Sequence, residues 1–454
     1  MQKGPAEISH FLSALRAAEQ CLDQGFRDLP PWPAVELDEQ ATAILHETAT
    51  RLRENYPYWH PLYAGQMLKP PHPIARAAYA LAMSVNPNNH ALDGGRASSA
   101  MEVEAVAALA KMFAWPQHLG HLTSGGTFAN LEALWVAGQL APGKMIAASD
   151  QAHYTHSRIS SVLGLSFTSI PSDDIGRMDL NALRQLLASG SVGCIVVTLG
   201  TTAIGAVDPL DRILKLREKY NFRIHVDAAY GGYFTLASNL DREARAAFDA
   251  IPQADSIVVD PHKHGLQPYG CGAVLFRDPT VGRFYKHDSP YTYFSSKELH
   301  LGEISLECSR AGAAAVALWT TQRLLPCTSG GEFARGLEAG RSAALELRHR
   351  LAADLRFAAP IATPELDILF WAVRAESSPR SSALAQSVFD QAAKLDLHLA
   401  LARLPVRLFP PATWPGSESG YVTCLRSVLM KPDHLSWIDE IWQRLDRATA
   451  NALG

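Results

Sequence analysis

Apolar and polar residues follow a helical spacing at the start of the chain. Ile8, Phe11, Leu12 and Leu15 recur on one helix face, and a second helical run extends from about 39 to 53. A proline-rich loop at 30–33 separates the two runs. Because these pieces are too thin to fold alone, we expect residues 1–55 to form a helical arm that wraps another surface.

Between 144 and 278 the pattern changes, and short β-rich runs alternate with helical stretches such as 180–188 and 209–220. The β-rich runs are 144–149, 166–170, 194–200, 222–227, 256–260 and 272–277. The runs centred on 194–200 and 222–227 are nearly all apolar, as strands buried on both faces would be. This alternation predicts a mostly parallel sheet covered by helices, and the short connection before the last run leaves room for an antiparallel strand.

The end of the chain predicts a smaller unit. Strand-like runs at 366–373, 398–406 and 421–430 are interspersed with helical runs at 382–394 and from about 432. Four glycines cluster between 330 and 340, where we place a boundary. The predicted organisation is a helical arm at 1–55, a large α/β domain at 56–335 and a small C-terminal α/β domain at 336–454.

Composition excludes several classes of protein. The 454 residues are 47% apolar and 19% charged, which is typical of a globular protein, and the net charge is −4 without any basic block. We therefore expect no nucleic-acid or membrane partner. Six cysteines stand far apart without a CxxC pair, which favours a reducing, cytoplasmic location. Neither a signal peptide nor an apolar run of about 18 residues is apparent.

A run of small residues precedes a predicted helix near residue 128. It reads Thr123-Ser124-Gly125-Gly126-Thr127. Small residues let backbone N–H groups approach an anion, and the helix dipole favours negative charge there. The spacing matches neither the GxGxxG nor the GxxxxGK[ST] motif. We interpret the run as an anion cradle, while an ordinary glycine-rich turn capped by Thr127 would look the same.

Three further polar side chains follow predicted strands. Asp227 ends one strand at the edge where α/β sheets bind ligands, although such an aspartate is often a helix cap. Lys263 follows the next strand, and inside a pocket its amine would be a nucleophile toward aldehydes, whereas in a surface turn it would not. His153 follows another strand and could stack on a planar ring or simply be a satisfied loop histidine.

Two other kinds of site are disfavoured. His153 and His156 are three residues apart, but no HExxH motif or other ligand spacing is present, so we expect no metal. No GxSxG motif supports a serine nucleophile. Taken together, an anion cradle, a buried acid, a reactive lysine and a flat histidine on successive strand ends predict a pyridoxal 5′-phosphate (PLP) pocket.

At these motifs the sequence resembles the group II PLP-dependent decarboxylases of the fold-type I, aspartate aminotransferase-like superfamily. The resemblance extends from about 59 to 442. The matching motifs are NPNNHALDGG at 86–95, TSGGTFANLEAL at 123–134, SDQAH at 149–153, TLGTT at 198–202, HVDAAYGG at 225–232 and DPHKHG at 260–265. It implies an α/β fold with a large, mostly parallel seven-stranded-type sheet, a small C-terminal domain and a homodimer with shared active sites.

The resemblance also implies a role for individual residues. Lys263 would bind the cofactor's aldehyde covalently, Asp227 would pair with its ring nitrogen, and His153 would stack on the ring. Tyr291, with Tyr293 as the alternative, would return a proton to the substrate. The remaining cofactor contacts would be Gly126, Thr127, Thr202, Ala229 and His262, with Ser309 reaching the phosphate from the partner subunit. The substrate contacts would be Arg426, on the α-carboxylate, and Trp59, Tyr63, Gln66 and Met67.

The implied reaction is decarboxylation of an L-amino acid to its amine and CO2. We expect an aromatic substrate first and an acidic one next, although Gln66 and Met67 stand where aromatic decarboxylases place aromatic side chains. His264 likewise replaces the tryptophan that usually follows the lysine, and Phe128 replaces a glutamate. The alternatives are a carbon–carbon lyase like the sphingosine phosphate lyases and a catalytically silent PLP-binding protein.

Overall fold

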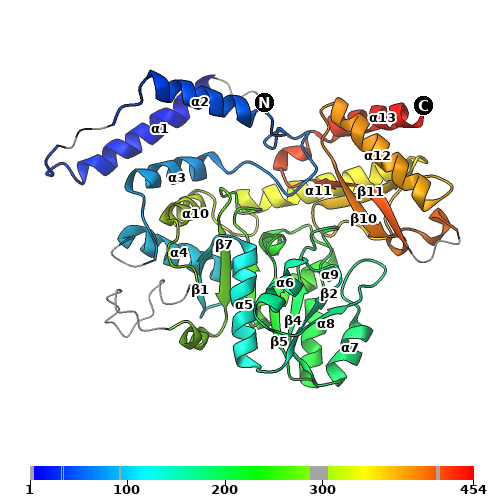
Figure 1. The fold of residues 1–454 in the computed structure, drawn as a ribbon. Helices are drawn as coiled ribbons and strands as arrows, with labels where there is room; N and C mark the ends of the chain where they lie inside the picture. Colours follow the sequence, from blue (N-terminus) through cyan, green and yellow to red (C-terminus); the bar gives the residue numbers. More distant parts are fainter. Residues whose placement is uncertain (1–4, 32, 34, 91–93, 287–304, 416–419) are drawn as a thin grey trace.

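The computed structural model describes residues 5–31, 33, 35–90, 94–286, 305–415 and 420–454. Its N-terminal part contains helices α1 (Pro5–Gln24) and α2 (Glu39–Leu52), which lie away from the large sheet (Figure 1). Asp38 caps α2 by accepting a hydrogen bond from the Ala41 N–H at 2.7 Å. No residue of α2 is buried, so this helix has no packed core within the single chain.

A seven-stranded sheet forms the centre of the molecule, in the order β1-β7-β6-β5-β4-β2-β3. The strands are β1 (Leu119–Thr123), β2 (Met145–Ser149), β3 (Phe167–Ile170), β4 (Val192–Thr198), β5 (Arg223–Asp227), β6 (Ser256–Val259) and β7 (Gly272–Phe276). Strand β7 is antiparallel to both β1 and β6, and the pairs from β6 to β3 are parallel. The predicted parallel sheet with an antiparallel member is therefore confirmed.

Helices cover both faces of this sheet, and its inner strands are therefore buried on both sides. Every residue of β4 is buried, which explains its uninterrupted apolar run. The surrounding helices are α3 (Pro73–Val85), α4 (Arg96–Met112), α5 (Gly126–Leu140), α6 (Thr155–Val162), α7 (Leu180–Ala188), α8 (Leu210–Lys215), α9 (Arg242–Asp249) and α10 (Gly312–Leu324). Short 3-10 turns join several of these elements, including η2 (Gly232–Leu236).

A second, antiparallel sheet of four strands lies in the C-terminal part, in the order β10-β11-β9-β8. Its strands are β8 (Phe357–Ala358), β9 (Ile368–Val373), β10 (Ala400–Pro405) and β11 (Tyr421–Val428). Helices α12 (Ser378–Lys394) and α13 (Ile438–Leu453) pack with it, and η8 (Pro432–His434) precedes α13. The predicted strands and helices of this region are present, with β8 as an additional short strand.

Helix α11 (Glu332–Ala353) joins the two sheets (Figure 1). Phe333 and Leu337 at its start pack in the core of the large sheet, whereas Leu347 and Leu351 pack in the core of the small one. The predicted boundary between residues 335 and 336 therefore falls inside a continuous helix, and the division into domains stays a prediction. Of the helices described, none combines the length and apolarity needed to cross a bilayer.

Candidate active site

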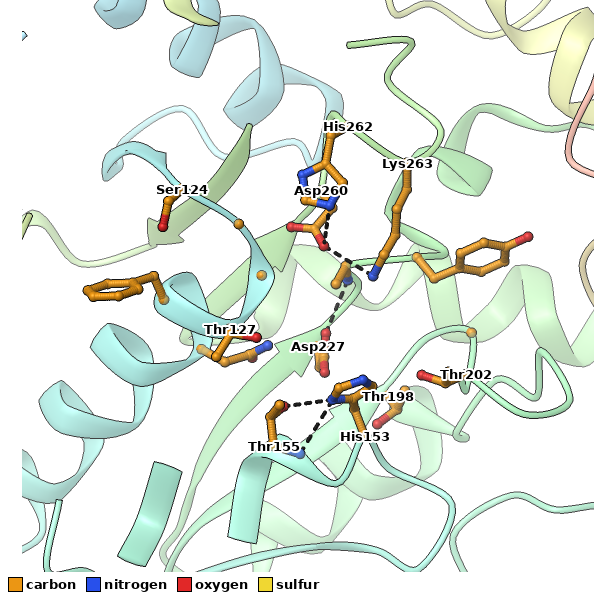
Figure 2. A pocket seen from close by; sticks show the side chains of 17 residues that line it. Ser124, Thr127, His153, Thr155, Thr198, Thr202, Asp227, Asp260, His262 and Lys263 are labelled. Atoms are coloured by element: carbon orange, nitrogen blue, oxygen red, sulfur yellow. Dashed lines mark hydrogen bonds and ion pairs between the residues drawn. The ribbon is translucent and has the colours of Figure 1, made fainter. Parts of the chain in front are cut away.

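A cavity of about 310 Å3 opens where β4, β5 and β6 end (Figure 2). Because parallel strands end at the same edge of a sheet, side chains that follow them converge there. Eight of the residues predicted from sequence line this cavity, namely Gly126, Thr127, His153, Thr202, Asp227, Ala229, His262 and Lys263. The strand-end positions therefore bring the predicted groups together.

The predicted anion cradle is the start of α5. Gly125 is the residue before the helix and provides no side-chain cap, and Thr127 lies inside the helix, so the interpretation of Thr127 as the cap is wrong. A Cβ atom on Gly126 would lie 2.7 Å from Oδ2 of Asp260, so any larger residue here would have to displace the Asp260 carboxylate. The Ser124 N–H donates to a Glu307 carboxylate oxygen at 2.9 Å, so this turn already accepts an anionic group.

Asp227 is buried and held by two donors. Its Oδ2 accepts from Nε2 of His156 at 2.8 Å, and its Oδ1 accepts from the Ala229 N–H at 3.1 Å. Burial opposes ionisation, but the hydrogen bond and charge of His156, with further help from Lys263, outweigh it and hold the pKa of Asp227 well below its usual range. The carboxylate stays ionised and can hold a proton on a bound nitrogen.

The structure adds His156 to the site as the hydrogen-bond partner of Asp227. The sequence did not suggest this role, because there His156 was considered only as a possible metal ligand. Asp260 is a second addition: its Oδ2 lies 3.1 Å from the Lys263 amine and 3.5 Å from Nε2 of His262. The Lys263 side chain extends into the cavity towards this carboxylate (Figure 2). Sequence alone places Asp260 in the motif but does not show which way its side chain points.

His153 forms part of the cavity wall. Its Nδ1 is 2.8 Å from the Thr155 hydroxyl, which fixes the orientation of the ring (Figure 2). Burial lowers the pKa of His153, despite the opposing charge of Asp227, so the imidazole is neutral at pH 7. A neutral, oriented ring in this position suits stacking on a planar ligand.

Three buried polar atoms of the cavity lack a partner within the described residues. They are the Thr198 hydroxyl, Oδ1 of Asp260 and Nδ1 of His262. Buried polar atoms are normally paired, so the cavity calls for a polar ligand. An anion-accepting turn, an ionised buried carboxylate, a lysine amine and a neutral imidazole together match the phosphate, ring nitrogen, aldehyde and aromatic ring of PLP.

Arg426 lies beside the cavity rather than in its lining. This β11 side chain is 4% exposed, and its guanidinium donates to the carbonyls of Thr202 at 2.6 Å, Ala203 at 2.8 Å and Gly65 at 3.1 Å. It also reaches Oε1 of Gln66 at 3.4 Å. In this structure Arg426 thus fixes the loop that presents Thr202.

The other predicted substrate contacts also lie outside the cavity lining. Trp59 is 56% exposed, Tyr63 is buried, Gln66 contacts Arg426, and the Met67 carbonyl accepts from the Tyr269 hydroxyl. Within a single chain, these four residues therefore do not share the cavity that Lys263 lines.

Three predicted residues of the shared site cannot be placed in this cavity. Ser309 is exposed, and its hydroxyl accepts from Nδ2 of Asn88 at 3.2 Å. It does not line the cavity of its own chain. Tyr291 and Tyr293 lie outside the described residues.

Comparison with known proteins also indicates a PLP-dependent enzyme. The profile of the pyridoxal-dependent decarboxylase conserved domain matches residues 139–373, a span that contains Asp227 and Lys263. The chain belongs to this family. Its cofactor is accordingly PLP, and it is a carboxy-lyase.

Curated relatives differ in the amino acid they are named for. The L-tyrosine decarboxylase of Enterococcus faecium is 28% identical, with 78% of this chain and 76% of the relative aligned. A probable L-tyrosine/L-aspartate decarboxylase of Methanocella arvoryzae is 29% identical over 63% of this chain and 73% of the relative. An L-2,4-diaminobutyrate decarboxylase of Acinetobacter baumannii is 29% identical over 58% of each.

Solved structures share the fold. Mouse CSAD in its apo form superposes with a TM-score of 0.78 at 21% identity, covering 98% of this chain and 99% of that one. Oryza sativa TDC with PLP and tryptamine gives 0.76 at 17% identity, with both chains fully covered. The predicted α/β fold of type I is therefore confirmed.

Proposed function

We propose that this enzyme removes the α-carboxylate of an L-amino acid to give the amine and CO2, with an aromatic substrate favoured and an acidic one next. The observation that carries the proposal is that Lys263 and the ionised Asp227 line one cavity beside an anion-accepting turn. The curated relatives are named for tyrosine, for tyrosine or aspartate, and for 2,4-diaminobutyrate, which supports an amino acid substrate and includes both proposed classes.

We assign the roles of the side chains from their surroundings. Bound PLP supplies an electron sink for the electrons released when the bond from Cα to the carboxylate breaks. Asp227 holds a proton on the ring nitrogen, because its depressed pKa keeps it ionised. His153 stacks on the ring, and the start of α5 binds the phosphate. Lys263 would hold the cofactor at its aldehyde carbon, with the aldehyde oxygen leaving as water. The Lys263 amine that is set free when the substrate amine takes its place, or Tyr291 with Tyr293 as the alternative, would supply the proton that Cα receives.

Substrate binding is assigned to the loop that Arg426 holds. The guanidinium of Arg426 makes four donor contacts, to Thr202, Ala203, Gly65 and Gln66. A guanidinium has five N–H groups, so one of them has no acceptor among the described residues and can bind a ligand. We propose that this N–H, on a side chain that is otherwise fixed, binds the α-carboxylate.

A homodimer would complete the site. Apolar side chains on α1 and α2 are exposed in the single chain, among them Ile8 at 50%, Leu12 at 55%, Ile44 at 54% and Leu45 at 55%. Apolar patches of this kind mark interaction surfaces, and a second copy of the chain would cover them. Light scattering of the whole chain and of a form lacking residues 1–55 tests this proposal, which predicts a dimer that the truncation weakens.

We also propose a cytoplasmic location. All six cysteines are free, including the exposed Cys21 and Cys308, as expected in a reducing compartment. Fractionation of cells that produce the protein, with activity assayed in each fraction, tests this directly.

The decisive experiment for function measures CO2 and amine release by the purified, PLP-loaded protein. The panel contains tyrosine, tryptophan, DOPA, glutamate, aspartate and 2,4-diaminobutyrate, and Lys263→Ala is the matched control. We expect CO2 from at least one amino acid and none with the control. Aldehyde release without CO2 would instead support a carbon–carbon lyase, and no product from any substrate would support a silent PLP-binding protein.

A further inference from the structure

Consecutive residues of the DPHKHG motif line two different cavities. Lys263 lines the cavity described above, whereas His264 lines a second cavity of about 450 Å3. We call the second one the rear cavity. Its polar lining comprises Lys69, His264 and Lys431, on which the inference rests, together with His72, Glu332, Arg335 and Asp433, and its other walls are apolar. The roles assigned to the PLP site do not use Lys69, His264 or Lys431.

Two lysines reach into the rear cavity with few partners. Lys431 is 3% exposed, and its Nζ donates to the Tyr63 carbonyl at 2.6 Å. Lys69 Nζ donates to the Met430 carbonyl at the long distance of 3.4 Å. Because an ammonium group carries three N–H donors, each lysine retains donors that no described residue accepts. Asp367 and Asp433 lie near enough to interact electrostatically with the two amines, but no described carboxylate accepts a hydrogen bond from either, so an acidic ligand could supply the missing acceptors.

His264 is the third incompletely paired group. It is 1% exposed, and neither ring nitrogen has a hydrogen-bond partner among the residues described. Nε2 lies 3.4 Å from Oδ2 of Asp367, but burial holds the pKa of His264 well below its usual range, so the neutral ring forms no ion pair. A buried imidazole in this state provides a donor and an acceptor for a ligand.

The remaining walls of the rear cavity are largely apolar. They include Pro70, Pro71, Leu266, Phe333 and Pro432. An inorganic anion would leave these walls in contact with water, whereas the body of an organic acid would cover them.

We propose that the rear cavity binds a small carboxylic acid with an apolar body, whose carboxylate is held by Lys69, Lys431 and His264. Such a ligand would contact the residue next to Lys263, so the site is placed to influence the cofactor site without overlapping it. The proposal stands on this second cavity and does not depend on which amino acid is decarboxylated.

Binding should be linked to protonation of the two amines. Burial lowers the pKa of Lys69 to about 8, and burial together with the charge of Lys69 lowers the pKa of Lys431 to about 7. The other charged or titratable groups that face them are Asp367, Asp433, His72, His264, His434, Glu332 and Arg335. A bound carboxylate stabilises the ammonium forms, so at pH 8 binding should take up protons.

The test is calorimetric titration of the PLP-loaded protein with 3-phenylpropionate at pH 8, in two buffers of different ionisation enthalpy. We expect saturable binding with net proton uptake. Lys69→Met and Lys431→Met should each weaken binding roughly ten- to hundredfold, because each removes hydrogen bonds to a charged group. The matched control is Lys111→Met, which changes an exposed lysine on α4 and should leave the affinity unchanged. An unchanged visible absorbance of the cofactor shows that each variant is folded.

Several outcomes would overturn the proposal. One is the absence of saturable binding, and another is equal affinity for inorganic phosphate, which would show that the apolar walls contribute nothing. A third is loss of binding in Lys263→Ala with no loss in Lys69→Met, which would place the ligand in the PLP site. This last control distinguishes failure of the inference from failure of the proposed function, because binding to the rear cavity does not require decarboxylation.

Discussion

The contact between His156 and Asp227 couples the chemistry of the site to pH. The 2.8 Å hydrogen bond is one cause of the depressed pKa of Asp227, so losing it should raise that pKa. Activity requires ionised Asp227, and the acidic limb of the rate–pH profile should therefore move to higher pH in His156→Phe. A limb that stays in place while PLP remains bound would contradict this role for His156.

A second prediction concerns Asp227 itself. Asp227→Asn keeps the shape of the side chain but removes the charge that holds the proton on the ring nitrogen. We expect kcat to fall by about a hundredfold or more, which is typical for removal of a preorganised electrostatic group. Steady-state CO2 release checks this, and cofactor absorbance verifies that PLP is still bound. Near-normal kcat in the loaded variant would refute the role.

Which single residues could be predicted depends on how far their partners lie along the chain. Asp227, Lys263 and His153 could be identified because Asp227 ends an apolar strand and the other two lie shortly after the ends of β6 and β2. The partnership of His156 with Asp227 spans 71 residues, and nothing local in the sequence reports it. Asp260 was visible as part of a motif, but its contact with Lys263 depends on the turn that follows β6.

At the level of elements, strand β7 supports the anion cradle from behind. A Cβ atom on Gly272 would lie 2.6 Å from Cα of Gly125, so Gly272→Ala must displace the turn before α5. We expect weaker PLP binding, measured by titrating the apo-protein with PLP. Gly120→Ala on β1 is the control, because its Cβ would meet the Val274 carbonyl at 2.8 Å, away from the cradle. It should lower stability but change PLP affinity much less; equal losses of affinity would contradict the prediction.

Elements within the alternating region were predictable, whereas β1 was not. Strands β2 to β7 and the helices between them follow from apolar runs and their spacing. Strand β1 has five residues and pairs with β7, about 150 positions later, so its place depends on a distant partner. Glycines near 336 suggested a boundary, yet Gly340 lies inside α11. A Cβ atom at this position would be 2.7 Å from the Leu429 carbonyl oxygen. Close packing, rather than a linker, accounts for that glycine.

For the molecule as a whole, buried ionisable groups should make stability depend on pH. Burial lowers the pKa of His434 to about 3, against about 6.5 in an unfolded chain. Below pH 6.5 the unfolded chain therefore binds a proton that the folded chain does not, and the free energy of unfolding falls as the pH falls towards 3. Asp208 and Asp367, whose pKa values burial raises to about 7 and about 6, act with the opposite sign.

The contribution of His434 is therefore measured as a difference between variants. His434→Gln should have a lower free energy of unfolding than the parent at pH 8. Between pH 6.5 and 5.5, however, its free energy of unfolding should fall by about 1 kcal/mol less than that of the parent. The reason is that one pH unit corresponds to about 1.4 kcal/mol for a fully titrating group, and His434 titrates only partly near pH 6.5 in the unfolded chain. Urea unfolding of both proteins at these pH values provides the comparison. The exposed His46, changed in the same way, is the control, and equal losses in parent and His434→Gln would contradict the assignment.

The most direct test of the central claim locates the cofactor on the chain. The PLP-loaded protein is reduced with borohydride, digested and analysed by mass spectrometry for the peptide that carries the added cofactor mass. Our account predicts the modification at Lys263, and its absence after Lys263→Ala. Modification at another lysine, such as Lys69 or Lys431 in the rear cavity, would contradict the assignment of the active site.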